Sequence, residues 1–145
     1  MKLLSVLAST FLTVAAIPYS SQSQGRFEIV DLPDPKNWVA GRRLFPANVI
    51  AGYNAAYDQY DAESWADYVL NKCYGYHDCT STITFSAINS GTPKDRFWFG
   101  YVFRGGPTTP NDYKRDWNPL SAVEDSIAFT TEGDNDIMQL QTQLK

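Results

Sequence analysis

A run of apolar and aromatic residues from Phe97 to Phe103 constrains the fold more than any other part of the sequence. Four rings alternate along one face of the strand expected here, namely Phe97, Phe99, Tyr101 and Phe103. Trp98 and Val102 make the opposite face apolar as well. Because a strand that is apolar on both faces must be covered on each, we expect it in the middle of a sheet that carries packed elements on both sides.

The segment that starts at Asp61 predicts a helix. Asp61 is a good N-cap, and Glu63 suits the positive end of the helix dipole. Apolar residues then recur at helical spacing, at Trp65, Tyr68, Val69 and Cys73. Gly75 can end the helix. We therefore expect one amphipathic helix with its apolar stripe turned inward.

Further strands are expected on either side of this helix. Val49–Tyr53 has the residues of a strand, in which Gly52 permits a bulge or bend. Residues 80–88 alternate between apolar and hydroxyl side chains, which indicates a strand with one buried face, and a turn follows at Asn89–Pro93. Asp125–Thr130 is the last strand candidate.

Thr109–Asp112 is expected to form a short helical turn between the aromatic strand and the last strand. The element order predicts an α+β fold, in which one main amphipathic helix packs on an antiparallel sheet.

Cys73 and Cys79 are the two cysteines of the chain. Five residues separate them, which does not fit a Cys-x-x-Cys redox motif, and His77 as the one histidine leaves a zinc site short of ligands. We predict one disulfide, Cys73–Cys79, which clamps one corner of the fold; a metal pair and a redox motif are the alternatives.

The first sixteen residues predict a cleaved secretory signal peptide. Met1-Lys2 supplies a positive start, Leu3–Ala16 is apolar apart from Ser and Thr, and Val14-Ala15-Ala16 offers small residues for cleavage. The run is shorter than the roughly 20 residues needed to span a bilayer. A buried N-terminal helix is the alternative. The prediction implies a secreted, extracellular protein with no membrane attachment after the signal is removed.

Three further segments follow the signal peptide. Residues 17–47 are rich in Pro, Ser and Gln and are expected to form an extended lead-in, with one short strand candidate at Phe27–Val30. Arg42-Arg43 in this lead-in is either a processing site or an ordinary surface pair. The compact domain is expected over residues 48–130, and residues 131–145 form a polar tail.

The helix with Trp65 and Cys73, the short loop to Cys79 and the following strand Thr82–Phe85 resemble the PAN/apple module. The order from Val49 to Phe129 is similar to the apple-like segments of small secreted fungal proteins. The resemblance implies an α+β module that binds protein or carbohydrate at a cell or wall surface. The departure is that apple modules usually carry further disulfides.

Charge narrows the range of partners. The net charge is −4 at neutral pH. Phosphate-backbone binding depends on clustered Lys and Arg, so nucleic acid is not an expected partner. The sequence leaves the oligomeric state open.

The search for catalytic chemistry finds no constellation. His77 is the one candidate base, yet the cysteines are expected to be oxidised and no Gly-x-Ser-x-Gly motif is present. Carboxylates cluster near the helix start, at Asp58, Asp61, Glu63 and Asp67, and a hydrolase that uses two of them stays open. Calcium at Asp134–Asp136 lacks a complete binding loop. We predict no enzyme activity, metal or cofactor.

Aromatic side chains near loops are the functional candidates, because tyrosine and tryptophan can stack on sugars or anchor a protein. The proposed ligand-binding residues are Tyr74, Tyr76, Arg104 and Trp117. The resulting hypothesis is a secreted non-catalytic interaction protein for a protein or carbohydrate at a cell surface, cell wall or host interface. A small carboxylate hydrolase and a structural wall or matrix component are the alternatives.

Overall fold

The computed structural model describes residues 26–133. The strands are β1 (Phe27–Ile29), β2 (Trp38–Ala40), β3 (Val49–Ala56), β4 (Ser81–Ile88), β5 (Arg96–Phe103), β6 (Tyr113–Arg115) and β7 (Glu124–Thr131). The helices are α1 (Ala62–Tyr74) and the 3₁₀ turns η1 (Tyr57–Gln59) and η2 (Pro110–Asp112). The predicted signal peptide (1–16) and residues 134–145 of the predicted tail lie outside the described residues.

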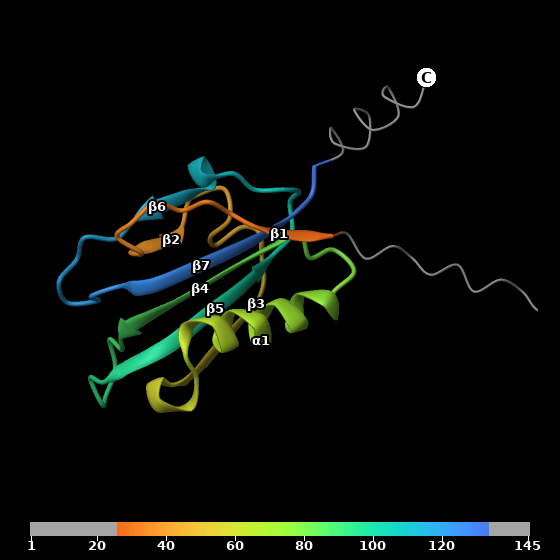
Figure 1. Cartoon of the computed structure of the whole chain (residues 1–145). Coiled ribbons are helices and arrows are strands. Elements are labelled where there is room, and N and C mark those ends of the chain that lie inside the picture. Colours follow the sequence, from red (N-terminus) through yellow and green to blue (C-terminus); the bar gives the residue numbers. More distant parts are fainter. Residues whose placement is uncertain (1–25, 134–145) are drawn as a thin grey trace, which may run out of the picture.

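The architecture is α+β, as expected. Five strands form an antiparallel sheet in the order β1-β7-β4-β5-β3, and β2 pairs with β6 in a small second sheet. Helix α1 covers one face of the large sheet and the small sheet lies over the other (Figure 1). Within residues 26–133, α1 is too short and too polar to cross a bilayer, and so is every other helix.

Helix α1 has the bounds that its capping residues predict. The Asp61 carboxylate accepts a hydrogen bond from the Ser64 backbone N–H at 2.8 Å, and Gly75 is the C-cap. The buried stripe consists of Trp65, Ala66, Val69 and Cys73. The Trp65 indole donates to the carbonyl of Phe99 at 3.0 Å, which ties the helix to β5. The predicted inward stripe is therefore confirmed.

Strand β4, and not β5, lies in the middle of the sheet, so the expected central position of the aromatic strand is corrected. Strand β5 is an inner strand between β4 and β3. Strand β4 is buried on both faces, although its alternation predicted one buried face. Thr84 lies on the side of α1, close to Gly100 and Val69. Its hydroxyl donates to the carbonyl of Ile127 at 3.2 Å, so it can be buried without water.

The face of β5 that points away from α1 is only partly covered. The small sheet packs its strand β2 against β4 and β7. Phe97, Phe99 and Tyr101 on β5 stay half-buried as a result, whereas Trp98 and Val102 are fully buried beneath α1. The prediction that both faces of this strand are closed therefore holds on the helix side and fails at these three rings.

The ordered domain begins well before the boundary expected at residue 48. Strand β1 pairs with β7, so that Ile29 lies opposite Phe129, and β2 pairs with β6. Leu32 and Leu44 are buried in the core. The predicted lead-in is thus part of the fold from its Phe27 strand onward, because its scattered apolar residues fill the space between the two sheets.

Arg43 of the dibasic pair holds a loop in place. Its guanidinium contacts the Asp112 carboxylate at 2.6 Å and donates to the carbonyls of Gly105 and Pro107 at 2.9 and 3.1 Å. Leu44, the next residue, is buried. These contacts favour a structural pair over a processing site, since cleavage there would separate β1 and β2 from the domain.

Candidate functional site

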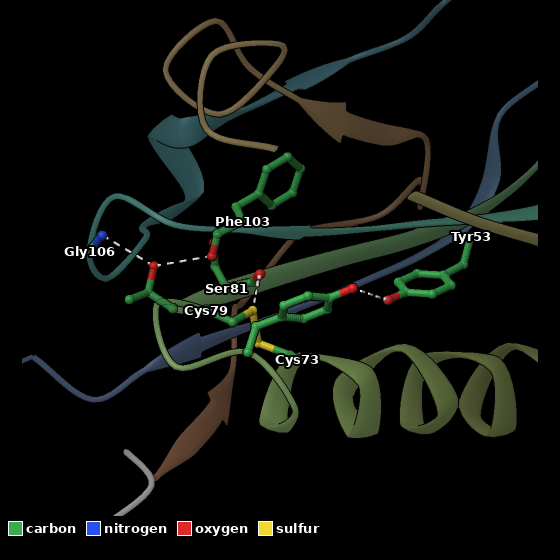
Figure 2. The surroundings of a disulfide bond; sticks show 8 residues. Tyr53, Cys73, Cys79, Ser81, Phe103 and Gly106 are labelled. Carbon is green, nitrogen blue, oxygen red and sulfur yellow. Dashed lines mark hydrogen bonds between the residues drawn. A yellow bond between two sulfur atoms is a disulfide. The ribbon is translucent and has the colours of Figure 1, made fainter. Parts of the chain in front are cut away.

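The predicted disulfide is confirmed and forms one corner of the domain. Cys73 and Cys79 are bonded, with their Cα atoms 5.4 Å apart, and join the end of α1 to the start of β4 (Figure 2). The Thr80 hydroxyl accepts from the Gly106 backbone N–H at 3.1 Å and donates to the Phe103 carbonyl at 3.4 Å. The corner is therefore fastened to the loop that follows β5 and begins with Arg104.

A hollow of about 160 Å³ lies at this corner, and we call it the corner pocket. Its lining residues are Ile50, Tyr76, His77, Asp78 and Arg104. They come from the β3 strand, the disulfide loop and the end of β5. The sequence brings them together through the disulfide, which places the loop beside the strand ends.

Ile50 reaches the corner pocket because of an irregularity in β3. The register with β5 shifts between Val49 and Ala51, which makes Ile50 the extra residue. A bulge of this kind redirects a side chain. Ile50 packs with the helix-side core and forms an apolar part of the pocket wall. The irregularity expected at Gly52 therefore occurs two residues earlier.

The polar groups of the pocket carry opposite charges. His77 Nδ1 lies 3.0 Å from the Asp78 carboxylate, and both side chains are largely exposed. Arg104 is exposed and has no ion-pair partner among residues 26–133. The wall of the pocket thus presents a cation that is free to bind a further group.

Tyr76 is fixed by a second tyrosine. Its hydroxyl lies 3.3 Å from the hydroxyl of Tyr53, as Figure 2 shows for the labelled Tyr53 and its partner ring. Burial, followed by this hydrogen bond, raises the pKa of Tyr53 to about 12. Tyr53 therefore stays neutral through the physiological range and keeps its hydroxyl available to hold Tyr76.

The structure brings together two of the four predicted ligand-binding residues, Tyr76 and Arg104. The ring of Tyr74 packs edge-on against Phe27, with ring centroids 5.2 Å apart. Trp117 belongs to a different part of the surface, where the Arg115 guanidinium lies 5.8 Å from its ring. The four residues do not form one site.

A second hollow lies on the open side of the large sheet, and we call it the aromatic groove. It has a volume of about 210 Å³ and is lined by Val39, Ala40, Phe45, Phe85, Tyr101 and Lys114. The rings of Phe45 and Tyr101 meet edge-on at 5.4 Å, and those of Phe85 and Tyr101 lie 6.4 Å apart. Phe45 is 46% exposed, so this apolar wall is open to solvent.

Small residues on β3 position Tyr101 and keep the groove open. Gly52 lies opposite Tyr101, and a Cβ at Gly52 would be 3.0 Å from the Tyr101 ring. Asn54 and Ala56 follow on the same face, opposite Phe99 and Phe97. The ring of Tyr101 therefore lies against bare backbone, and nothing bulky on β3 covers the neighbouring rings.

This groove is not predicted from the sequence, because Tyr101 is expected in a closed core and Phe45 in the lead-in, whereas Phe85 is buried as expected. The signal that was available is the contrast in side-chain size between the adjacent strands β3 and β5. Gly52 and Ala56 are too small to cover an aromatic neighbour. That contrast becomes meaningful only when the pairing of β3 with β5 is known.

The carboxylates near the helix start do not converge on either hollow. Asp61 caps the helix, and its pKa is lowered by the hydrogen bond from the Ser64 backbone. Asp58, Glu63 and Asp67 are exposed, and none lines the corner pocket or the aromatic groove. Within the described part of the chain, no three His, Cys, Asp or Glu side chains gather as metal ligands.

The fold and these two hollows define a disulfide-clamped α+β domain with an aromatic groove on its sheet and a polar pocket at its corner. Comparison with protein-family models, curated proteins and solved structures finds no match for this chain.

Proposed function

We propose that this protein is a non-catalytic interaction protein that works outside the cell and binds a protein partner through the aromatic groove. The observation that carries the proposal is the open groove itself. Phe45, Phe85 and Tyr101 line it, and Phe45 is 46% exposed. Exposed aromatic surface of this kind is typical of a site that another molecule covers, since aromatic residues dominate the binding energy of interfaces.

The size of the groove favours a single side chain of a protein over a drug-sized ligand. Pockets for drug-sized ligands have volumes of about 300–1,000 Å³. The groove has about 210 Å³ and is therefore suited to one large apolar side chain. Lys114 lies at the same wall and is exposed. A partner with a large apolar residue beside a carboxylate would match both features.

The non-catalytic character rests on the side chains at the aromatic groove. The groove holds one titratable cation, Lys114, and one tyrosine, Tyr101, whose pKa is raised by burial. Neither forms the acid–base pair that hydrolysis by carboxylates requires. The resemblance to PAN/apple modules, which rests on order and spacing, also favours an interaction role.

The extracellular location is supported by two independent features. Residues 1–16 have the pattern of a secretory signal. The Cys73–Cys79 bond is of the kind that forms and persists in oxidising compartments. The proposal therefore places the partner at a cell surface, a cell wall or a host interface.

Selection from a random peptide library displayed on phage tests the proposal directly. We expect the peptides selected on the disulfide-bonded protein to share one large apolar residue. Their affinity should fall about tenfold or more for Phe45→Ala, because a truncated central anchor typically costs about 2 kcal/mol. Lys114→Glu should weaken peptides that carry an acidic residue beside the anchor.

Leu120→Ala and Trp117→Phe are matched controls, because Leu120 and Trp117 are exposed apolar residues that do not line the groove. Both should bind the selected peptides like the unchanged protein. Peptides that bind Phe45→Ala equally well would overturn the proposal. Release of sugar from chitin, β-glucan or cellulose would instead favour the hydrolase. Concentration-dependent self-association without peptide binding would favour a structural component.

A further inference from the structure

We propose that the corner pocket is a second binding site, which takes one neutral sugar ring of a glycan. The site is separate from the aromatic groove and shares no lining residue with it. The inference does not depend on the proposed protein partner. It rests on the combination of side chains that the Cys73–Cys79 corner brings together, namely Ile50, Tyr76, His77, Asp78 and Arg104.

The charges in the pocket select the ligand class. A guanidinium only donates hydrogen bonds, and an ionised carboxylate only accepts them. Arg104 and Asp78 line the same pocket of about 160 Å³, so a free anion there would meet a carboxylate and a free cation would meet a guanidinium. Hydroxyl groups both donate and accept, so neighbouring hydroxyls of one neutral molecule can bind both residues at once. A polyhydroxylated ligand therefore fits the pair better than an ion does.

The apolar part of the pocket points to a ring-shaped ligand with a nonpolar face. Tyr76 is 40% exposed and Ile50 is half-buried beside it. The C–H face of a sugar ring can lie against such a surface, while its hydroxyls reach the polar rim. Aromatic rings with polar neighbours serve this purpose because they are apolar on the face and polar at the edge.

The pocket wall is held in place before any ligand binds. The Tyr53 hydroxyl lies 3.3 Å from that of Tyr76, and the disulfide ends three residues further on at Cys79. The Thr80 hydroxyl accepts from the Gly106 backbone and so fixes the loop of Arg104 (Figure 2). Preorganisation of this kind reduces the entropy lost on binding.

The size of the pocket limits what it can hold. A volume of about 160 Å³ fits one ring and not a longer segment. The rest of a glycan would lie outside, on the exposed surface of the disulfide loop, where His77 and Asp78 are largely exposed. We therefore expect weak binding of single sugars and somewhat tighter binding of short oligomers.

Titration of the disulfide-bonded protein with chitotetraose, cellotetraose and laminaritetraose tests this inference, with calorimetry and amide chemical shifts as readouts. At least one oligomer should bind and shift the amides of residues 76–78 and 104. Tyr76→Ala should weaken binding about three- to tenfold through lost stacking. Arg104→Ala should weaken it roughly tenfold or more, because hydrogen bonds to a charged group are lost.

Tyr76→Phe keeps the ring and removes the hydroxyl that contacts Tyr53, so it should bind less tightly than the unchanged protein but more tightly than Tyr76→Ala. Tyr57→Ala, at a 43% exposed tyrosine outside the pocket, is the matched control. Phe45→Ala should also bind the sugar normally, which separates this site from the groove.

Three results would overturn the inference. The first is that none of the three oligomers binds. The second is binding that Tyr76→Ala leaves unchanged. The third is that galacturonate or acetate binds the pocket more tightly than every neutral oligomer, which would make it an anion site. All three leave the peptide test of the aromatic groove unaffected.

Discussion

Gly100 on β5 lies directly beneath Val69 of helix α1, so closely that a Cβ at Gly100 would be 2.5 Å from Val69 Cγ2. Thr84 on β4 contributes a second close contact, at 3.3 Å from the same position. The helix can therefore approach the sheet because β5 has no side chain at this point. This contact sets the distance between the layer that carries the disulfide corner and the sheet that carries the groove.

Gly100→Ala should destabilise the protein by about 1–3 kcal/mol, because the added methyl group overpacks the helix–sheet contact. Unfolding in urea, followed by tryptophan fluorescence, measures the change. Gly91→Ala is the control, since a Cβ there meets only Asn89 at ordinary contact distance. Equal stability of the two variants would show that α1 does not pack as closely as described.

Trp65→Phe should lower the free energy of unfolding by about 1–2 kcal/mol, because the buried indole loses its hydrogen bond to the Phe99 carbonyl. The fully buried Trp65 contrasts with Trp117, which is 71% exposed. Trp117→Phe should leave the midpoint of thermal unfolding unchanged. A Trp65→Phe protein that is as stable as the Trp117→Phe protein would contradict the placement of α1.

Asp112→Asn should lower stability at neutral pH and have little effect in acid. The hydrogen bond from Arg43 holds the pKa of Asp112 below its ordinary value. A carboxylate with a depressed folded pKa adds stability above its unfolded pKa of about 3.9, and that stability is lost as the pH falls through the folded pKa. The difference from the unchanged protein should thus shrink below about pH 4.

Unfolding free energies at several pH values between acid and neutral measure this difference. In Asp112→Asn the amide oxygen can still accept from the Thr109 backbone N–H, which now donates to Asp112 at 2.8 Å, so the change removes the charge and the acceptor that faces Arg43. The exposed Asp31 offers the control Asp31→Asn, which removes a carboxylate charge without changing the contact between Arg43 and Asp112. A deficit in Asp112→Asn that persists unchanged in acid would refute the role assigned to Arg43.

Replacing Cys73 and Cys79 together by alanine should lower the free energy of unfolding by about 2 kcal/mol, as the loop-entropy model gives for a short loop. The two cysteines are six positions apart, so the bond restrains one corner and not the whole fold. We expect the variant to fold and to lose sugar binding at the corner pocket more than peptide binding at the groove. Reductant titration of the unchanged protein should reproduce both effects.

The local elements of this fold can be predicted from short stretches of sequence. Asp61, the spacing from Trp65 to Cys73 and Gly75 define α1, and the observed helix matches them. The turn at Thr109–Asp112 is confirmed as η2 with its capping pair. These signals succeed because capping and periodicity act between residues a few positions apart.

The order of the strands in the sheet cannot be predicted from such local signals. The aromatic strand was expected at the centre, but β4, with its row of hydroxyl side chains, lies there. Thr84 and Ser86 are buried because Ile127 and Asp125 accept their hydrogen bonds from another strand. Such partners lie about forty positions away, so no local pattern identifies them.

The amino-acid sequence alone predicts the helix, the disulfide pair, most of the strands and the α+β class, since each depends on neighbouring residues or on pairing the only two cysteines. Tertiary packing, in contrast, places Gly52 against Tyr101, brings Phe45 and Tyr101 into one groove, and brings Tyr76 and Arg104 into one pocket. Those contacts join segments far apart in the chain, and their geometry follows from strand pairing and layer packing, which the whole molecule sets together.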